Sequence, residues 1–400
     1  MQRSRQRFLT THQGSLARPP DLLALLLARQ EGQPYDAAKL GTRLRAAVAD
    51  VVQQQVDAGI DVVNDGELSK VGWAAYFASR LSGVEQRPGR ASVPQHGITA
   101  RDLRVFPEWF ELARSAGGPV YSWVALAAAR QGQSTGGSFR MGNFCAGPLT
   151  YTGQAEVETD IANLKAACQG KPVANMFLTA LGPATMAFFM ANDYYPSDEE
   201  YAHALADAMH HEYKAITDAG VVLQVDEPAL AANWQTYPDM TVAEYRRWVQ
   251  AQVEVLNHAL RGVPPELVRV HVCWGSLHHP HEHDIPLAEI LDLILQLNVQ
   301  TYSFEAANPR HDADWQVWDK AKLPDGKILM PGVVGHYTDF VEAPELVAER
   351  FAKYARVVGR ENIIGGTDCG VATRVGHPSI GWAKFRAMSE GARLASNQLF

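Results

Sequence analysis

Residues 220–228, GVVLQVDEP, and residues 267–273, LVRVHVC, are short apolar runs that end in polar side chains. Between them, residues 241–261 repeat their apolar side chains at the period of an amphipathic helix. A strand, a helix and a second strand in this order are typical of a βαβ unit, in which the two strands lie parallel. This stretch therefore predicts a parallel sheet covered by helices.

The same kind of run occurs eight times along the chain. The other six runs are FLTTHQGS at 8–15, IDVVNDGE at 60–67, PVANMFLTALG at 172–182, VQTYSFE at 299–305, KILMPGVVG at 327–335 and ENIIGGTDC at 361–369. Helix signals separate them, such as Ser197 with Glu200 as a capping box and Pro344 at a helix start. Eight parallel strands that alternate with helices predict an α/β fold, the (β/α)8 TIM barrel.

One long segment, residues 80–172, breaks this rhythm. It contains a helix pattern at 107–116, the glycine-rich stretch GQSTGGS at 132–138 and an extended segment at 144–153. We expect a single barrel domain over residues 1–400, with residues 80–172 as an insertion after the second strand that covers the barrel mouth.

Charge and composition exclude several classes of partner. A net charge of -8 leaves no overall basic field to attract a polyanion, so nucleic acid is not expected as a partner. We find neither an apolar stretch of the roughly 20 residues that a membrane span needs nor a signal-peptide pattern. The 4 cysteines are too widely spread for a disulfide framework, which favours a reducing cytoplasm.

The carboxyl ends of barrel strands carry the catalytic groups in folds of this type, and here several of these ends are polar. His271 and Cys273 end the fifth run, Glu305 ends the sixth and Cys369 ends the eighth. Residues two apart on a strand share a face, so His271 and Cys273 can both point into the mouth. One imidazole, two thiolates and one carboxylate match the ligands that zinc prefers. Zinc there would lower the pKa of a substrate thiol, while the surplus negative charge keeps its sulfur nucleophilic.

Two other interpretations of these four residues remain open. Each of them, taken alone, fits an ordinary buried core residue. All four could also be permanent ligands of a closed zinc site in a protein that is not an enzyme.

The segments around these residues resemble a known family. HVCWG at 271–275, SFEAANPRH at 303–311 and GGTDCGVATR at 365–374 are similar to the zinc-site segments of cobalamin-independent methionine synthases and of their shorter relatives, which include the epoxyalkane:coenzyme M transferases. TTHQGSLARP at 10–19 and WAKFRAMSEGARLAS near the end extend the similarity over nearly the whole chain. The resemblance implies a zinc cofactor held by the four residues, a small-molecule thiol such as homocysteine and a methyltetrahydrofolate-type donor as co-substrate.

Three further strand ends carry side chains suited to a substrate. The resemblance implies that Ser15 binds the homocysteine carboxylate and that Glu67 and Asp226 bind its ammonium group. Two carboxylates that face one site favour a cation and disfavour a sulfonate such as coenzyme M. This favours methyl transfer to an amino-acid thiol over the alternative, the opening of an epoxide by a coenzyme M type thiol. A simpler role for Glu67 or Asp226 is to cap the next helix.

The proton donor of the family is less well matched. It lies five residues after the first glycine of the segment GVVGHYTDF, a position that Tyr337 occupies here, with His336 adjacent. Successive side chains on a strand point to opposite faces, so we expect only one of the two, His336 or Tyr337, to be the acid. Arg374 matches a family arginine and is expected to position substrate or to pair with a carboxylate. Trp274 suits either stacking on a flat ligand or the core.

A run of four histidines raises the question of a second metal site. It comprises His278, His279, His281 and His283. Pro280 and Pro286 interrupt the segment and no strand supports it, so we expect a solvated loop near the zinc rather than a second metal site.

Overall fold

In the computed structural model, the eight predicted runs form the eight strands of one parallel sheet. The structure describes residues 1–88, 90, 92–93, 97–115, 141–275, 278–372 and 374–400. In spatial order the strands are β1 (Leu9–Thr10), β11 (Ile364–Thr367), β10 (Ile328–Val334), β9 (Thr301–Phe304), β8 (Val268–Val272), β7 (Val222–Asp226), β5 (Asn175–Leu181) and β2 (Val62–Asn64). Each neighbouring pair is parallel.

The first and last strands of this order approach each other. The backbone N–H of Asp61 donates to the carbonyl of Thr10 at 3.1 Å. The hydroxyl of Thr11 donates to the carbonyl of Val62 at 2.9 Å. These bonds bring β1 beside β2, so the sheet curls into a nearly closed barrel and confirms the predicted (β/α)8 class.

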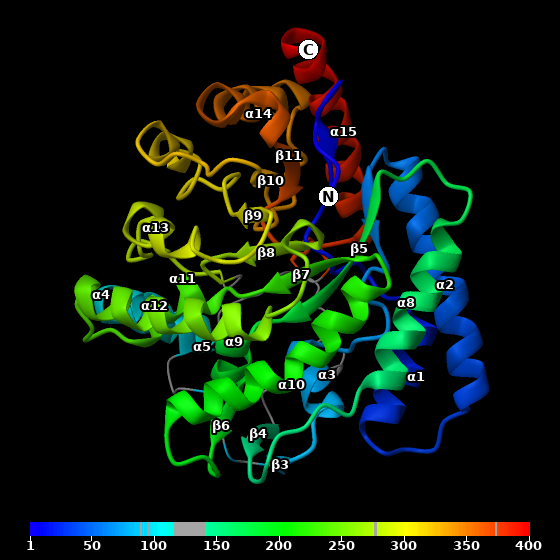
Figure 1. Ribbon diagram of the computed structural model, residues 1–400, viewed down its shortest axis with the longest axis vertical. Helices are drawn as coiled ribbons and strands as arrows, with labels where there is room; N and C mark the ends of the chain where they lie inside the picture. The colour runs from blue at the N-terminus through cyan, green and yellow to red at the C-terminus, as the bar shows by residue number, and fades with distance from the viewer. Residues whose placement is uncertain (89, 91, 94–96, 116–140, 276–277, 373) are drawn as a thin grey trace.

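Helices surround the barrel (Figure 1), and most neighbours in this ring pack against each other. The ring consists of α2 (Ala37–Asp57), α8 (Gln154–Cys168), α10 (Asp198–Asp218), α12 (Val242–Ala259), α13 (Leu291–Ile294), α14 (Pro344–Val358) and α15 (Pro378–Leu399). The predicted start signals are present: the Ser197 hydroxyl accepts from the N–H of Glu200, and Pro344 opens α14. Within the described part of the chain, no helix has the length and apolar character needed to cross a membrane.

Shorter helices follow or connect the strands. They are α1 (Pro20–Gln30), α3 (Trp73–Arg80), α9 (Pro183–Phe189), α11 (Ala229–Thr236) and the 3-10 turns Gly97–Thr99, Pro265–Leu267, Leu287–Glu289, Asp314–Asp319 and Arg360–Asn362. Two of them, α9 and α11, directly follow β5 and β7. Two elements of the insertion, the turn Gly97–Thr99 and the helix at 100–105, pack against α11, so the insertion lies at the carboxyl end of the strands.

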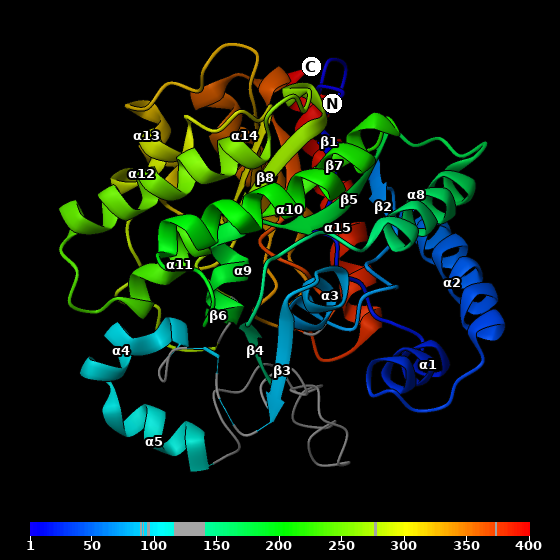
Figure 2. The same cartoon turned by 60° about the horizontal axis from the view of Figure 1, so that its bottom comes forward.

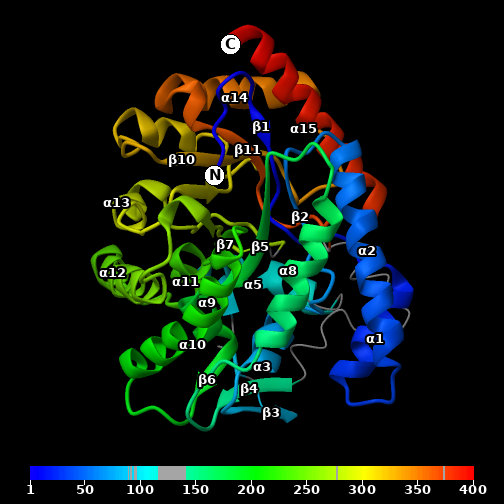
Figure 3. The ribbon, with the colours of Figure 1, turned by 45° about the vertical axis from the view of Figure 1, so that its right-hand side comes forward.

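Added structure between β2 and β5 includes the small sheet strands β3 (Val84–Pro88) and β4 (Met141–Cys145) and the helices α4 (Ala100–Val105) and α5 (Pro107–Ser115). Figure 2 shows these elements together at one end of the barrel. The third strand of the small sheet, β6 (Met190–Asn192), comes from outside residues 80–172. Helix α8 lies within that segment but packs between α2 and α10 as part of the ring (Figure 3). Residues 132–138 lie outside the described residues.

Polar side chains fill the barrel beneath the site. On β8, the valines at 268, 270 and 272 pack into the main hydrophobic core, while Arg269 alternates with them. The fully buried Arg269 guanidinium donates to Gln224 Oε1 at 2.8 Å and to the carbonyl of His12 at 2.7 Å. It thereby links β8 to β7 and to the segment after β1. Because residues two apart share a face, the same alternation turns His271 toward the barrel axis.

Candidate metal centre and its surroundings

Three of the predicted metal ligands come together at the carboxyl end of the barrel. His271 lies near the end of β8, Cys273 follows that strand, and Cys369 follows β11. Their ligand atoms all lie within 4.8 Å of one another, and the three residues are at most 8% exposed. Since β9 and β10 separate β8 from β11 in the sheet, only the curvature of the barrel brings these residues together.

The chemistry of this cluster fits a zinc ion. Both ring nitrogens of His271 are buried and without a hydrogen-bond partner among the described residues, which is costly unless another group satisfies them. A hydrogen bond from Cys273 lowers the pKa of Cys369 well below its usual value, and the same contact raises the pKa of Cys273. Two thiols, one of them with a lowered pKa, and a buried imidazole form a donor set of the kind that zinc selects.

Glu305, the predicted fourth ligand, lies beside this cluster but is not one of its three members. It follows β9 and is buried, and burial raises its pKa well above the usual value. Its carboxylate accepts from the N–H of Trp274 at 3.1 Å and from Asn308 Nδ2 at 2.8 Å. The bond to Trp274 connects Glu305 directly to the residue after Cys273.

Two predicted substrate carboxylates lie close to the same cluster. Glu67 has a φ of 56°, and its Oε1 accepts from the Thr179 hydroxyl at 2.9 Å. Asp226 ends β7 and accepts from Gln224 Nε2 at 2.6 Å. Burial raises the pKa of Asp226 well above its usual value, and the charges of Glu67 and Cys369 add to this effect. An arriving ammonium group would relieve this repulsion.

Ser15 and Arg374 belong to the segments next to Cys369. The carbonyl of Ser15 accepts from the N–H of Ala372 at 3.2 Å, in the turn that follows Cys369. A methyl group added at Gly370 would lie 3.0 Å from the Ser15 Cβ, so only a small residue fits there. The charge of Arg374 acts on the pKa of His336. Both predicted residues therefore lie near the cluster.

His336 and Tyr337 lie side by side, with ring centroids 4.0 Å apart. We expected them to point to opposite faces of a strand, but β10 ends at Val334, so strand alternation does not apply to them. His336 is fully buried, which lowers its pKa to about 3, and neither ring nitrogen has a partner among the described residues. The Tyr337 hydroxyl donates to the carbonyl of Gly275.

Trp274 is buried in the protein rather than open to a ligand. Its indole N–H donates to the carbonyl of Ile285 at 2.7 Å, and its ring stacks on His311 with centroids 3.9 Å apart. Only 1% of the residue is accessible to solvent. These contacts favour the core role over stacking on a flat ligand.

The histidine run is more ordered than the solvated loop that we expected. His279 Nδ1 lies 2.8 Å from an oxygen of Asp102, and His283 Nδ1 lies 3.1 Å from the other oxygen of the same carboxylate. His281 Nδ1 lies 2.8 Å from Asp284 Oδ2. Burial alone would raise the pKa of Asp102, but hydrogen bonds, including the one from His279, lower this pKa. The loop is fastened by buried carboxylates, one of which comes from α4.

Sequence reasoning missed Asp102, Asp284 and His311. His311 Nε2 lies 3.4 Å from Asp284 Oδ2, and His311 Nδ1 lies 2.9 Å from Asp314 Oδ2. The spacing of His281 and Asp284 was a usable signal, because residues three apart in a turn can form a hydrogen bond. Nothing in the sequence pairs Asp102 with a histidine 177 residues away.

A comparison with protein families agrees with this geometry. The model described as "Cobalamin-independent synthase, Catalytic domain" matches residues 141–393. The chain belongs to this family. The resemblance drawn from the zinc-site segments is thus confirmed, and as a member of the cobalamin-independent synthase family the chain is a methyltransferase.

Several members of the family are similar over most of their length. A methionine synthase of Sulfolobus acidocaldarius is 24% identical over 365 residues, which cover 90% of this chain and 85% of that protein. One of Thermococcus kodakarensis is 29% identical over 219 residues, 54% of this chain and 56% of that protein. The solved B12-independent methionine synthase of Shewanella sp. W3-18-1, 21% identical, covers 98% of this chain and 99% of its own with a TM-score of 0.69. This likeness shows the shared fold.

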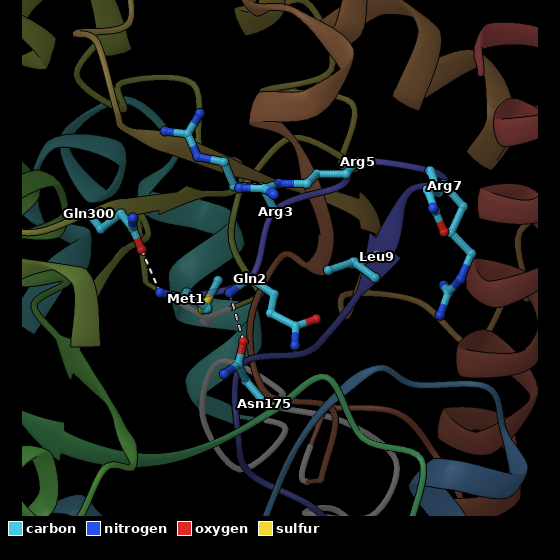
Figure 4. Close-up of a pocket in the computed structure, with 9 residues that line it drawn as sticks. Met1, Gln2, Arg3, Arg5, Arg7, Leu9, Asn175 and Gln300 are labelled. Carbon is cyan, nitrogen blue, oxygen red and sulfur yellow. Dashed lines mark hydrogen bonds between the residues drawn. The ribbon is translucent and has the colours of Figure 1, made fainter.

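In this protein, a cavity of about 840 Å³ lies away from the candidate metal centre (Figure 4). It is lined by Leu9, Asn175 and Gln300, which lie at or just before the starts of β1, β5 and β9, and by arginines of the first seven residues. The ligand cluster is at the opposite ends of the strands. The cavity therefore does not belong to the candidate metal centre.

Proposed function

We propose that this protein is a zinc-dependent transferase that methylates the thiol of homocysteine or of a similar amino acid, with a methyltetrahydrofolate-type donor as co-substrate. The observation that carries the proposal is the convergence of His271, Cys273 and Cys369 within 4.8 Å beside two buried carboxylates. The relatives from Sulfolobus acidocaldarius and Thermococcus kodakarensis, both of which bear the name methionine synthase, support it.

His271, Cys273 and Cys369 would hold the zinc ion, with Glu305 as the fourth ligand. When bound, zinc lowers the pKa of a substrate thiol so that its sulfur is a nucleophile near neutral pH. The unpartnered nitrogens of His271 and the low pKa of Cys369 support this ligand set, since zinc ligands must bind deprotonated.

The remaining residues would orient the substrates. Glu67 and Asp226 would bind the ammonium group of the amino acid, because two buried carboxylates are stabilised by a cation placed between them. Ser15 and Arg374 would bind its carboxylate. His336, with Tyr337 against its ring, would protonate the leaving nitrogen of the methyl donor.

The architecture also supports two broader proposals. Residues 1–400 would act as one barrel domain, with the elements between α3 and α8 covering the mouth near the metal centre. All four cysteines are free thiols, which suits a reducing cytoplasm and a cluster that must keep its thiolates.

The experiment that tests this function supplies zinc-loaded protein with homocysteine and methyltetrahydrofolate and measures methionine by mass spectrometry. Parallel reactions replace the substrates by coenzyme M and an epoxide. Methionine formation that a chelator abolishes would support the proposal. If only coenzyme M is alkylated, the reaction is instead the opening of an epoxide. If neither pair of substrates reacts, the protein holds zinc in a closed site without catalysis.

A further inference from the structure

The carboxylate of Glu67 is fixed by a residue of the neighbouring strand. Its Oε1 accepts from the hydroxyl of Thr179, which lies on β5, at 2.9 Å. Within the described part of the chain no hydrogen bond to its Oε2 is found, so one oxygen is held and the other is left for a ligand. The φ of 56° places the backbone of Glu67 in the left-handed region, a strained conformation that is common at ligand sites.

The direction of the bond between Thr179 and Glu67 is set by Lys70. Lys70 Nζ donates to Thr179 Oγ1 at 3.0 Å and also to the carbonyl of Thr179. A lysine ammonium group can only donate, so the hydroxyl oxygen of Thr179 accepts from it and the hydroxyl proton is left for Glu67. Lys70 Nζ also lies 4.3 Å from the centre of the Tyr76 ring, a favourable contact for a cation. The three residues of this chain of hydrogen bonds are all buried.

The turn after β2 brings Lys70 and Glu67 to the same threonine. The N–H of Lys70 donates to the carbonyl of Glu67 at 3.0 Å, which closes the turn between them. Strand β2 ends at Asn64, which lies opposite Phe177 of β5. Thr179 is two residues further along β5, on the same face as Phe177 and beside the turn that follows β2.

The charge of Lys70 also acts on the second carboxylate of the substrate site. Burial raises the pKa of Asp226 and the charge of Glu67 adds to this effect, whereas the charge of Lys70 opposes it. Lys70 thus favours the ionised form of Asp226 as well as the fixed position of Glu67. Ionised carboxylates in fixed positions form the strongest hydrogen bonds to an ammonium group.

We propose that Lys70 and Thr179 are positioning residues that hold Glu67 so that one of its oxygens receives the ammonium group of an amino-acid thiol. This inference rests on the proposed function, which gives Glu67 that ligand. It adds that the preference for an amino acid over the same thiol without an amino group depends on the hydroxyl of Thr179, and not on the two carboxylates alone.

The test compares the Kd of homocysteine with that of 4-mercaptobutyrate, which has the thiol and carboxylate but no ammonium group. Both are measured by calorimetric titration of the full-length, zinc-loaded protein. T179V replaces a hydroxyl by a methyl group, so we expect the Kd of homocysteine to rise about tenfold and that of 4-mercaptobutyrate by less than about twofold. T179S keeps the hydroxyl and should restore the wild-type ratio of the two Kd values. A merely structural role for Thr179 would weaken both thiols alike, and an unchanged ratio in T179V would overturn the inference.

T185V is the matched control. Thr185, on α9, is as buried as Thr179, and its hydroxyl also donates to a buried carboxylate, that of Glu227. The other bonds of that carboxylate are to the N–H groups of Ala184 and Thr185, at the start of α9. We expect T185V to keep the wild-type ratio of the two Kd values. The same change of ratio in T185V as in T179V would overturn the specific role of Thr179.

K70M supplies a second test if T179V does not fold, because it removes the charge and both hydrogen bonds to Thr179. The Kd of homocysteine should again rise by about tenfold relative to that of 4-mercaptobutyrate, and an unchanged ratio would overturn the inference. A wild type that prefers homocysteine, with the same preference in T179V and K70M, overturns this inference alone. A wild type that binds neither thiol, or both equally well, overturns the proposed amino-acid substrate and this inference together.

Discussion

Cys273 and Cys369 lie 96 positions apart in the sequence, after strands that are not neighbours, yet their sulfurs lie within 4.8 Å of each other. The closed barrel produces this pairing, and the pairing sets the acid strength of both thiols. The contact lowers the pKa of Cys369 well below its usual value, so this thiol loses its proton more readily than an isolated one.

Loss of a cluster cysteine should remove the metal. In C369S, the zinc affinity should fall by more than the roughly 10–100-fold that loss of a hydrogen-bond partner of a ligand costs. Zinc content after dialysis against a weak chelator measures this. C168S is the control, because Cys168 lies on α8 and outside the cluster. Equal zinc content in C369S and C168S would contradict the metal site.

Glu305 should contribute to zinc affinity as the fourth ligand. E305Q removes a negative charge beside the cluster, so we expect weaker zinc binding by the same dialysis assay. N308A provides a comparison, because it removes a hydrogen bond to Glu305 but keeps the carboxylate. A larger loss in N308A than in E305Q would show that Glu305 only supports the loop.

Asp226 should determine the preference for an amino group. D226N removes a charged partner that is worth about 1.5–3 kcal/mol, so KM for homocysteine should rise by roughly 10- to 150-fold. The KM for 4-mercaptobutyrate, which has the thiol and carboxylate but no ammonium group, should change little. If D226N weakens both thiols equally, Asp226 does not recognise the ammonium group.

Gly14 should be intolerant of a side chain because of its contact with Glu67. It has a φ of 115°, and an added methyl group would lie 2.7 Å from Thr179 Cγ2 and 2.8 Å from Glu67 Oε1. We expect G14A to lower the free energy of unfolding by about 1–3 kcal/mol and to raise KM for homocysteine. G32A is the control, since Gly32 also has a positive φ but faces open space. Equal losses of unfolding free energy in G14A and G32A, measured by urea unfolding, would exclude the contacts with Thr179 and Glu67 as the cause.

His311 should make stability depend on pH above neutrality. Burial would lower its pKa, but hydrogen bonds to Asp284 and Asp314 raise it to about 9. A pKa raised above the unfolded value near 6.5 adds stability that is complete below pH 6.5 and is lost as pH rises through 9, on the order of 3 kcal/mol in total. Urea unfolding between pH 6 and 10 should show this slope in the wild type and a weaker slope in H311Q. Parallel pH profiles of unfolding free energy in the wild type and in H311Q would contradict the assignment of this pH dependence to His311.

Local sequence patterns were sufficient to predict the barrel and the convergence of His271, Cys273 and Cys369. Each of the eight runs is a strand, because a parallel strand buried on both faces leaves a short apolar run in the sequence. His271, Cys273 and Cys369 could be predicted because strand ends in a barrel converge on one mouth, whatever their separation in the chain.

Contacts that depend on tertiary structure could not be predicted. The bond between Asp102 and His279 joins the insertion to the loop after β8, and no periodicity encodes it. The positions of His336 and Tyr337 were misjudged because β10 ends two residues before His336, and strand boundaries are less certain than strand existence. The core packing of Trp274 likewise depends on His311, which lies after the next strand.

The cluster of His271, Cys273 and Cys369 is proposed to activate a substrate thiol, and absorption spectra of the cobalt-substituted protein test this activation. Homocysteine, coenzyme M and glutathione are titrated in turn while the cobalt–thiolate band is followed. We predict one bound metal ion and a band that changes with homocysteine and with neither of the other thiols. No bound metal, or a spectrum that responds to none of the three, would contradict the claim.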